Sequence, residues 1–256
     1  MGGNILLKAE RRSEILRLLD ERNFMTVSDV VDAMGVSSMT IRRDVNELGE
    51  ENQLIRLYGG IQKIDIKEKE LTTSEKINLH KDRKEFIGKV MNSLIKDGDV
   101  VYVGAGTTIL YALPFITKKE LFVVTNSLIA FNYLVQNTDY KLLLTGGDYA
   151  PVTEEFIGEH AEKAFDTLNL DIAFAATNGI YNNNLTTSNL LQGSIQKAAF
   201  AHAKVKVAVA DSTKFNVSDV YTLYHLSDLD YVITDDKIDS ETFDYYSQYV
   251  HLLNKK

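Results

Sequence analysis

The sequence predicts an α/β protein with two domains: an N-terminal winged helix-turn-helix and a larger Rossmann-like domain built on a parallel sheet. Three observations predict this. Residues 9–48 carry three helical patterns, with a glycine-containing turn before the third. Two β-prone runs around a Gly-Gly pair come next, and beyond residue 84 apolar β-branched runs alternate with helix-like segments. We expect domains at residues 1–63 and 85–256, joined by a charged linker at 64–84.

The composition is that of an ordinary globular protein. Its 256 residues are 45% hydrophobic, which is enough to bury a full core. The absence of cysteine excludes disulfides, thiolate metal sites and a cysteine nucleophile. The net charge of −8 disfavours a general attraction to nucleic acid, so such a partner must be met by a local patch.

Neither a leader nor a membrane span is expected. Charges begin at Lys8, so the first residues lack the apolar core of a signal peptide. Residues 99–117 carry no charge after Asp99, but glycines and Pro114 interrupt them, which excludes a membrane helix. We therefore expect a cytoplasmic protein that does not associate with membranes.

The first two helices have clear signals. Residues 9–23 hold apolar side chains that fall on one side of a 3.6-residue period, namely Ile15, Leu16, Leu18 and Leu19. Thr26 is a suitable N-cap for a second helix over residues 27–34. Gly35 is expected to end that helix, because glycine adopts the left-handed conformation common at helix ends.

Ser37 or Ser38 is expected to cap a third helix over residues 39–48. Three apolar side chains at i, i+4 and i+7 would face the core: Ile41, Val45 and Leu48. The opposite side then presents Met39, Arg42, Arg43 and Asn46. Arginine can bond two acceptors on guanine and asparagine can pair with adenine, so this side is suited to a DNA groove. The alternative is a small helical domain whose arginines are only solvated.

A hairpin is expected after the third helix. The run "NQLIRLYGGIQKID" places Arg56 on a first strand and Tyr58 in the turn with two glycines. Such a hairpin would be the wing of a winged helix. Residues 1–63 hold nine Lys and Arg against ten Asp and Glu, so the prediction of DNA binding depends on geometry and not on charge.

The stretch "SSMTIRRDVNELGEENQLIRLYGG" resembles the N-terminal winged helix of DeoR-type bacterial repressors, in which S-x-x-T-[IV]-R-R-D-L precedes a Gly-Gly wing. The resemblance implies that Arg43 reads bases and that Thr40 holds a phosphate of a double-stranded operator. With the neighbouring helix and wing positions, the candidate DNA-binding residues are Ser37, Ser38, Thr40, Arg42, Arg43, Asn46, Arg56 and Tyr58.

The larger domain is predicted from alternating patterns. Short β-branched runs ("DVVYV", "LFVVT", "YKLLLTGG", "DIAFAA", "VKVAVAD", "YVITDD") are separated by helix-like segments such as "LIAFNYLVQN", "EHAEKAFDTL" and "QKAAFAHAK". Apolar strands that alternate with helices indicate a parallel sheet covered on both faces. Ligands of such sheets bind outside the carboxyl ends of the strands.

The uncharged stretch at residues 99–117 fits this arrangement. A buried strand leads into Gly104-Ala105-Gly106, and Thr107-Thr108 begin a helix. Glycines let the backbone close around an anion, while free N–H groups and hydroxyls supply donors. A dinucleotide fingerprint would need glycine where Ile109 stands, and Gly-Lys-Ser/Thr is absent, so a sugar phosphate is the better ligand. The alternative is a simple tight turn.

Polar or glycine residues also follow the other strands, and we expect them to converge at one edge of the sheet. The candidate effector-binding residues are Gly104, Ala105, Gly106, Thr107, Thr108, Asn126, Ser127, Gly146, Gly147, Asn178, Gly179 and Lys214. Lys214 would supply a point charge to a phosphate. Asp211 would accept a hydroxyl or cap the next helix.

This domain resembles the effector-binding domain of the DeoR family over residues 77–250, which implies a fold similar to ribose-phosphate isomerases and sugar-phosphate binding. The stretches "VTEEFIGEHA", "SIQKAAF" and "DSTKFNVSDVYTLYHLSDLDYVITD" resemble the branch that represses the lactose phosphotransferase system. In that branch the inducer implied is tagatose 6-phosphate.

Two functions are therefore weighed: a repressor released by a phosphorylated sugar, and a phosphosugar isomerase-like enzyme with an accessory N-terminal domain. Isomerase chemistry needs a positioned carboxylate, and the loop "NGIYNNNLTTSN" holds none. The five histidines are scattered, so neither a histidine triad nor a metal site is expected, and no cofactor. We favour the non-enzyme, as a homo-oligomer of two or more copies, because operators have paired half-sites.

Overall fold

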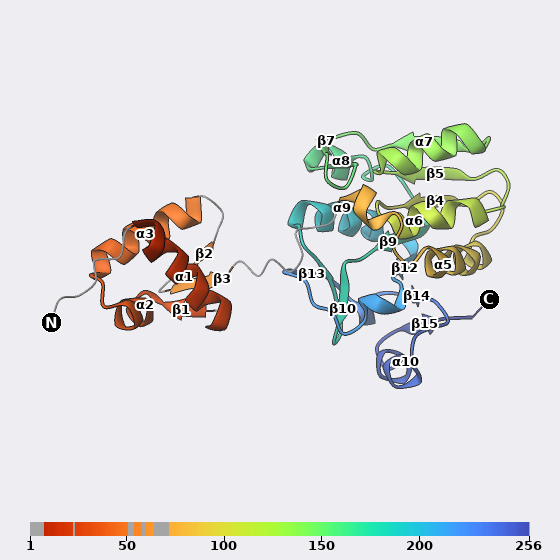
Figure 1. Ribbon diagram of the computed structural model, residues 1–256. Coiled ribbons are helices and arrows are strands. Elements are labelled where there is room, and N and C mark those ends of the chain that lie inside the picture. Colours follow the sequence, from red (N-terminus) through yellow and green to blue (C-terminus); the bar gives the residue numbers. More distant parts are fainter. Residues whose placement is uncertain (1–7, 23, 51–53, 58–59, 64–71, 256) are drawn as a thin grey trace. The chain divides into compact units, whose positions relative to one another are not determined.

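The computed structural model describes residues 8–22, 24–50, 54–57, 60–63 and 72–255. It divides the chain into two compact units, Met1–Lys69 and Glu70–Lys256 (Figure 1). Tyr58 and residues 64–71 of the expected linker lie outside the described residues. No described helix has the length and apolar character that crossing a bilayer requires.

The first unit contains three helices and a small antiparallel sheet. The helices are α1 (Lys8–Arg22), α2 (Val27–Met34) and α3 (Ser38–Glu50). The strands β1 (Phe24–Thr26), β2 (Leu54–Leu57) and β3 (Gly60–Lys63) pair in the order β1-β3-β2. The helix-turn-helix and its hairpin wing are as predicted. Strand β1 was not predicted, because a strand of three residues is too short to show an alternating pattern.

Local hydrogen bonds fix the turn between the helices. The backbone N–H of Asp29 donates to Oγ1 of Thr26 at 3.1 Å, and the N–H of Thr26 donates to the Asp29 carboxylate at 2.8 Å. This capping box begins α2. Gly35 then ends the helix with a φ of 63°, and its N–H donates to the Val31 carbonyl. Both ends of α2 match the prediction.

One apolar cluster holds the first unit together. It is formed by Ile15, Leu18, Leu19, Met25, Val30, Ile41, Val45, Leu48, Leu54 and Ile61. The predicted inward side of α3 is therefore confirmed. Leu16 is only partly buried, so the apolar side of α1 is narrower than expected.

A seven-stranded sheet is the centre of the second unit. Its strands are β4 (Val100–Val103), β5 (Phe122–Thr125), β6 (Lys141–Leu144), β9 (Leu170–Ala176), β12 (Ala203–Val209), β14 (Tyr231–Ile233) and β15 (His251–Leu253). Their order is β15-β14-β12-β9-β4-β5-β6, and every neighbouring pair is parallel. This confirms the predicted parallel sheet.

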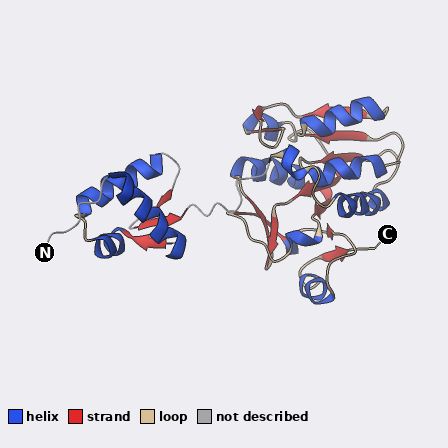
Figure 2. Cartoon of the chain, in the orientation of Figure 1, coloured by secondary structure: helices blue, strands red, loops and turns tan. Residues whose placement is uncertain are grey.

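Helices cover both faces of this sheet (Figure 2). They are α4 (Thr73–Lys76), α5 (Lys81–Leu94), α6 (Thr107–Ala112), α7 (Leu128–Asn137), α8 (Glu159–Lys163), α9 (Leu190–Ala201) and α10 (Ser240–Tyr246). One apolar core joins α5, α6 and α7 to Val101 and Val103 of β4. The other core joins α9 and α10 to Tyr102, so successive side chains of β4 point to opposite faces.

Two small sheets were not predicted. Strands β7 (Asp148–Ala150) and β8 (Glu155–Ile157) form a hairpin. Strands β10 (Gly179–Tyr181), β11 (Asn184–Thr187) and β13 (Tyr221–His225) form an antiparallel sheet in that order. The segment "NGIYNNNLTTSN", expected as a loop, is the hairpin β10–β11, because its pattern is too short and polar to indicate strands.

Some element bounds differ from those expected. The helical pattern over residues 159–168 gives only α8, and the pattern over residues 196–204 belongs to α9, which begins six residues earlier. Helix α6 ends at Ala112, two residues before Pro114, which lies within the 3-10 turn Leu113–Phe115. Residues 73–84, expected in the linker, form α4 and the start of α5 in the second unit.

Candidate functional site

Helix α3 presents polar side chains to solvent. Arg42, Arg43 and Asn46 are exposed, and Met39 has 81% of its surface exposed. Thr40 is half-buried, and its hydroxyl lies 2.9 Å from Oγ of Ser37, which precedes the helix. The outward side of α3 predicted from its periodicity is thus the observed one.

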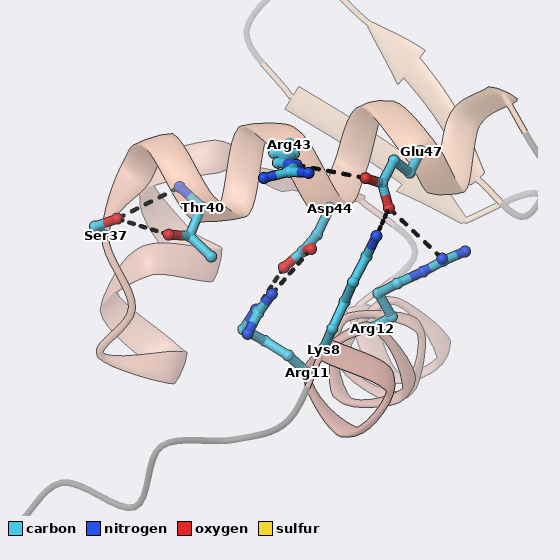
Figure 3. Close-up of polar contacts among 8 residues, drawn as sticks. All are labelled: Lys8, Arg11, Arg12, Ser37, Thr40, Arg43, Asp44 and Glu47. Carbon is cyan, nitrogen blue, oxygen red and sulfur yellow. Dashed lines mark hydrogen bonds and ion pairs between the residues drawn. The ribbon is translucent and has the colours of Figure 1, made fainter.

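Ion pairs hold α3 against α1 (Figure 3). The Arg11 guanidinium donates to both carboxylate oxygens of Asp44, at 2.5 and 3.1 Å, and Asp44 is only 1% exposed. Lys8 lies 2.5 Å from the Glu47 carboxylate, and Arg12 lies 3.7 Å from it. The hydrogen bond to Asp44 raises the pKa of Arg11, and the one from Lys8 lowers the pKa of Glu47. Basic groups of α1 are therefore engaged in positioning α3.

Arg43 remains accessible although it has an acidic neighbour. Its Nε lies 3.5 Å from the Glu47 carboxylate one turn later, and its side chain is 79% exposed. Exposed pairs of this kind contribute little free energy, so Arg43 can exchange this partner for another anion. Arg56 belongs to β2, but its side chain, like all of Tyr58, lies outside the described residues.

The turn Gly104-Ala105-Gly106, called the glycine turn below, follows β4. At β4 the order of strands in the sheet reverses its direction. Strand β4 has β5 on one side and β9 on the other, and this is the crevice in which open α/β sheets bind ligands. The N–H of Gly104 donates to the Phe174 carbonyl at 2.9 Å. Gly106 has a φ of 118°, and a Cβ there would lie 3.1 Å from Cβ of Ala176. The turn therefore needs glycine at position 106.

Lys84 reaches this turn from α5 and is not among the site residues predicted from the sequence. Its Nζ donates to Oγ1 of Thr107 and to the carbonyl of Lys76, both at 2.9 Å, and the residue is only 4% exposed. Burial lowers the pKa of Lys84 to about 8, opposed by the nearby charge of Asp211 and reinforced by that of Lys214. Among the described residues no carboxylate forms an ion pair with Lys84.

A signal for Lys84 was present in the sequence. Lys84, Ile87, Gly88 and Met91 are all buried and follow the i, i+3, i+4, i+7 spacing of one helix face. A lysine on an apolar face is unusual, because burial disfavours its charged form. It was overlooked because residues 64–84 were interpreted as a linker.

The first turn of α5 is attached to the carboxyl ends of other strands. Arg83 Nη1 donates to Oγ of Ser212 at 2.7 Å, just after β12. The N–H and hydroxyl of Ser212 both donate to the buried Asp235 after β14. Asp82 forms an ion pair with Lys237. These contacts hold Lys84 in position at the sheet edge.

Asp211 and Lys214 lie at the same edge. The N–H and hydroxyl of Thr213 donate to the Asp211 carboxylate, so Asp211 caps the 3-10 turn Ser212–Lys214. Lys214 is half-buried in that turn, close enough to influence the Lys84 ammonium. The structure thus places Lys214 within electrostatic range of Lys84 and gives Asp211 a capping role.

Other predicted residues have structural contacts of their own. Asn126 is fully buried: it accepts from the Tyr102 hydroxyl and donates to the Glu155 carboxylate, each at 2.9 Å. Ser127 caps α7. Asn178 donates to Ser188 and Asp219, among residues of the β10–β11–β13 region. A role of these residues in ligand binding stays a prediction.

Packing also explains two of the predicted glycines. A Cβ at Gly147 would lie 2.6 Å from the Ile157 carbonyl oxygen, and one at Gly179 would lie 2.4 Å from that of Val217. Gly146 has a φ of 67°, so it fits a left-handed turn. These glycines let neighbouring chains approach closely, whatever else they do.

Buried carboxylates exist at this edge, although the segment "NGIYNNNLTTSN" holds none. They are Glu155, Asp211 and Asp235. Each accepts hydrogen bonds from neighbouring protein groups, as Asn126, Thr213 and Ser212 show. Within the described ranges there is no cluster of three or more histidine, aspartate or glutamate side chains that could hold a metal ion.

A helix-turn-helix unit followed by an α/β unit of this topology is the architecture of a two-domain transcriptional regulator. The family model for the DeoR-like helix-turn-helix domain matches residues 11–67, and that for the DeoR C terminal sensor domain matches residues 79–236. The chain belongs to the DeoR family.

Two bacterial repressors are similar in sequence to this chain over nearly its whole length. The lactose phosphotransferase system repressor of Streptococcus mutans is 32% identical over 96% of this chain and 99% of its own. The repressor of the same name from Lactococcus lactis is 35% identical over 96% of this chain and 98% of its own. The predicted resemblance to this branch is confirmed at the level of sequence.

Solved structures give more distant likenesses. Ribose 5-phosphate isomerase from Plasmodium falciparum is 15% identical, with a TM-score of 0.39 and coverage of 53% of either chain. The enzyme from Methanocaldococcus jannaschii is 19% identical, with a TM-score of 0.39 and coverage of 52% of this chain and 54% of that one. Similarity at this level concerns the path of the backbone and says nothing about activity.

Proposed function

We propose that this DeoR-family chain represses genes of lactose or galactose use and is released from its operator by a phosphorylated sugar, in first place tagatose 6-phosphate. The observation that carries the ligand class is the buried Lys84 ammonium at the glycine turn, with no ion-paired carboxylate among the described residues. The lactose assignment rests on the names of the relatives that span the whole chain.

The exposed side of α3 supports the DNA-binding part. Arg42, Arg43 and Asn46 can reach base edges, while Ser38 and Thr40 near the start of the helix can hold a phosphate oxygen. The Arg11–Asp44 pair keeps the helix in register on α1. We infer that the operator is bound by at least two copies, because one recognition helix reads only a half-site.

The surroundings of Lys84 support an anionic ligand. A buried cation is costly unless an anion or several hydrogen bonds compensate for it, and here both of its partners are neutral oxygens. The Lys214 side chain and the Thr107 hydroxyl would add a charge and a donor. A phosphate placed at the glycine turn would therefore satisfy Lys84 and gain from its low-dielectric setting.

The second partner of Lys84 suggests how the signal leaves the pocket. Lys76, whose carbonyl accepts from Lys84, is the last residue of α4, which in the sequence is the first described element of the second unit. A bound phosphate would compete with this carbonyl for the ammonium. We infer that the ligand loosens the α4 segment in this way, and so favours a state with lower operator affinity.

An isomerase remains the second candidate, favoured only by the buried carboxylates at the sheet edge. Glu155, Asp211 and Asp235 are engaged by neighbouring groups, which supports a structural role for them. A coupled assay with aldose and ketose phosphates tests this. Turnover would support the enzyme, and its absence in a preparation that binds the same phosphates supports the regulator.

Thermal unfolding of the full chain with a panel of hexose 6-phosphates tests the ligand proposal. A ligand present at a hundred times its Kd stabilises the folded form by about 2.7 kcal/mol, which raises the melting temperature measurably. We expect tagatose 6-phosphate to give the largest shift and unphosphorylated tagatose to give none. Equal shifts with and without the phosphate group would contradict the proposal.

A further inference from the structure

Two buried side-chain oxygens of the described residues lack a hydrogen-bond partner, Oγ1 of Thr234 and Oε1 of Gln196, and the second lies near the glycine turn. Gln196 is 8% exposed on the buried face of α9, and its Nε2 donates to the carbonyl of Ala176 at 3.2 Å. Its Oε1 is buried and, in the described part of the chain, accepts no hydrogen bond. Exchanging the amide nitrogen and oxygen would set Oε1 against a carbonyl, so the observed orientation is the favourable one.

This amide lies beside the glycine turn. Ala176, which accepts from Gln196, is also the residue that Gly106 packs against, at 3.1 Å from the position of a Cβ there. Helix α9 covers one face of the sheet and α5, which carries Lys84, covers the other. A buried cation and an unpaired acceptor thus belong to helices on opposite faces of the sheet, close to the carboxyl ends of β4 and β9.

The chemistry of the two groups differs. Lys84 and Thr107 can donate to a phosphate, but a carbonyl oxygen such as Oε1 can only accept. The phosphoryl group of a dianionic sugar phosphate has no proton to give, so this group alone leaves Oε1 unsatisfied. Buried acceptors are normally paired, and this one therefore calls for a ligand that also carries an O–H or N–H donor.

We propose that Gln196 accepts a hydrogen bond from a hydroxyl of the bound sugar phosphate, and that this bond distinguishes the phosphosugar from inorganic phosphate and from the corresponding deoxy sugar. The proposal rests on the ligand class inferred above. Sites that hydrogen-bond a substrate hydroxyl discriminate strongly against analogues without it, because their own polar group is then left unpaired. Gln196 is thus a specificity residue of the pocket.

Isothermal titration of the full chain tests this with five probes: the 6-phosphates of tagatose, fructose, galactose and glucose, and inorganic phosphate. The variant Gln196→Met keeps the length of the side chain and removes the acceptor. We expect Gln196→Met to bind the tightest hexose 6-phosphate about tenfold more weakly than the unaltered chain does, as for the loss of one neutral hydrogen bond. Its affinity for inorganic phosphate should be unchanged.

Single-position deoxy analogues of that hexose 6-phosphate identify the bond. One of them should bind the unaltered chain about tenfold more weakly than the parent sugar, and Gln196→Met should not distinguish the two. Gln192 is a matched control, because it lies one turn earlier on the same face and donates to Thr153. We expect Gln192→Met to retain the affinity of the unaltered chain for both probes.

Unchanged sugar affinity in Gln196→Met, or an equal fall for sugar phosphate and inorganic phosphate, would overturn the proposal. If Gln196→Met does not fold, a deoxy series that binds the unaltered chain uniformly overturns it instead. A different result would show that the ligand is not a phosphorylated sugar held at Lys84. In that case no phosphorylated probe would bind, or Lys84→Met would bind the phosphorylated probes as tightly as the unaltered chain does.

Discussion

The ammonium group of Lys84 lies 2.9 Å from the Thr107 hydroxyl and is buried at the glycine turn without an ion-paired carboxylate among the described residues. Its other hydrogen bond goes to the carbonyl of Lys76 in α4. One side chain thus connects the candidate anion site to the segment that follows the DNA-binding unit. Five predictions concern this lysine, Arg43 and the Arg11–Asp44 pair.

Lys84→Met should stabilise the second unit and abolish its response to sugar phosphates. A methionine of similar length fills the same space without a buried charge, so the free energy of unfolding should rise by about 1 kcal/mol. Differential scanning calorimetry without ligand measures the first effect, and the ligand-induced melting shift measures the second. A variant that is less stable yet still shifted by tagatose 6-phosphate would contradict the role given to Lys84.

Sugar-phosphate affinity should fall above the Lys84 pKa of about 8. Below it the amine is charged, and a phosphate monoester is a dianion above about pH 6, so affinity should be highest between these values. Above it, affinity should fall by up to about tenfold per pH unit, because one proton must be taken up on binding. Titration calorimetry across this range measures the profile, and an affinity that stays constant as the pH rises above about 8 would contradict the role of Lys84.

The same pKa has a consequence for stability without ligand. The pKa of Lys84 is lowered from 10.5 in the folded chain, so between about 8 and 10.5 the unfolded chain binds more protons. The contribution of Lys84 to the free energy of unfolding should therefore increase as pH rises through this window. Comparing the unaltered chain with Lys84→Met in urea denaturation isolates this contribution. A difference between them that is independent of pH would argue against a lowered pKa.

Arg43→Ala should weaken operator binding by about tenfold to a hundredfold, because a side chain that bonds base acceptors contributes about 1–3 kcal/mol. Arg17→Ala is the matched control: Arg17 is another exposed arginine with an ion pair within its own helix, to Glu14 of α1. Fluorescence anisotropy with a DNA site selected from random duplexes measures both at one salt concentration. Equal affinities for the two variants would exclude Arg43 from the interface.

Asp44→Asn should loosen the packing of α3 on α1, although Asp44 is buried and does not face the proposed DNA-binding side. It removes the charge partner of Arg11, whose side chain is largely buried, and should destabilise the first unit by about 2 kcal/mol. Hydrogen exchange of the α1 and α3 amides should accelerate accordingly. Glu14→Gln, which breaks the exposed pair with Arg17, should leave these rates unchanged, and similar acceleration in both variants would refute the special role of the buried pair.

Patterns that repeat over many residues were predictable from the sequence. The period of α3 placed Ile41 inside and Arg43 outside, and the alternation of apolar runs with helices indicated the parallel sheet. Short elements such as β1 and β15 were missed, because three residues hold too little pattern. Lys84 was missed for another reason: its spacing with Ile87, Gly88 and Met91 indicates a buried helix face, but residues 64–84 were expected to be a linker. Its contact with Thr107 depends on the packing of α5 against a turn distant in the sequence, which the spacing alone does not predict.

The central claim is that a phosphosugar held at Lys84 and the glycine turn lowers operator affinity. It is tested most directly by anisotropy titrations of the selected DNA site, with and without saturating tagatose 6-phosphate, on the unaltered chain and on Lys84→Met. We expect the ligand to weaken DNA binding of the unaltered chain by about 5-fold to 150-fold, the usual range of coupling between two sites, and to leave Lys84→Met unaffected. A ligand effect of equal size in both proteins, or none in the unaltered chain despite binding of the sugar, would contradict the account.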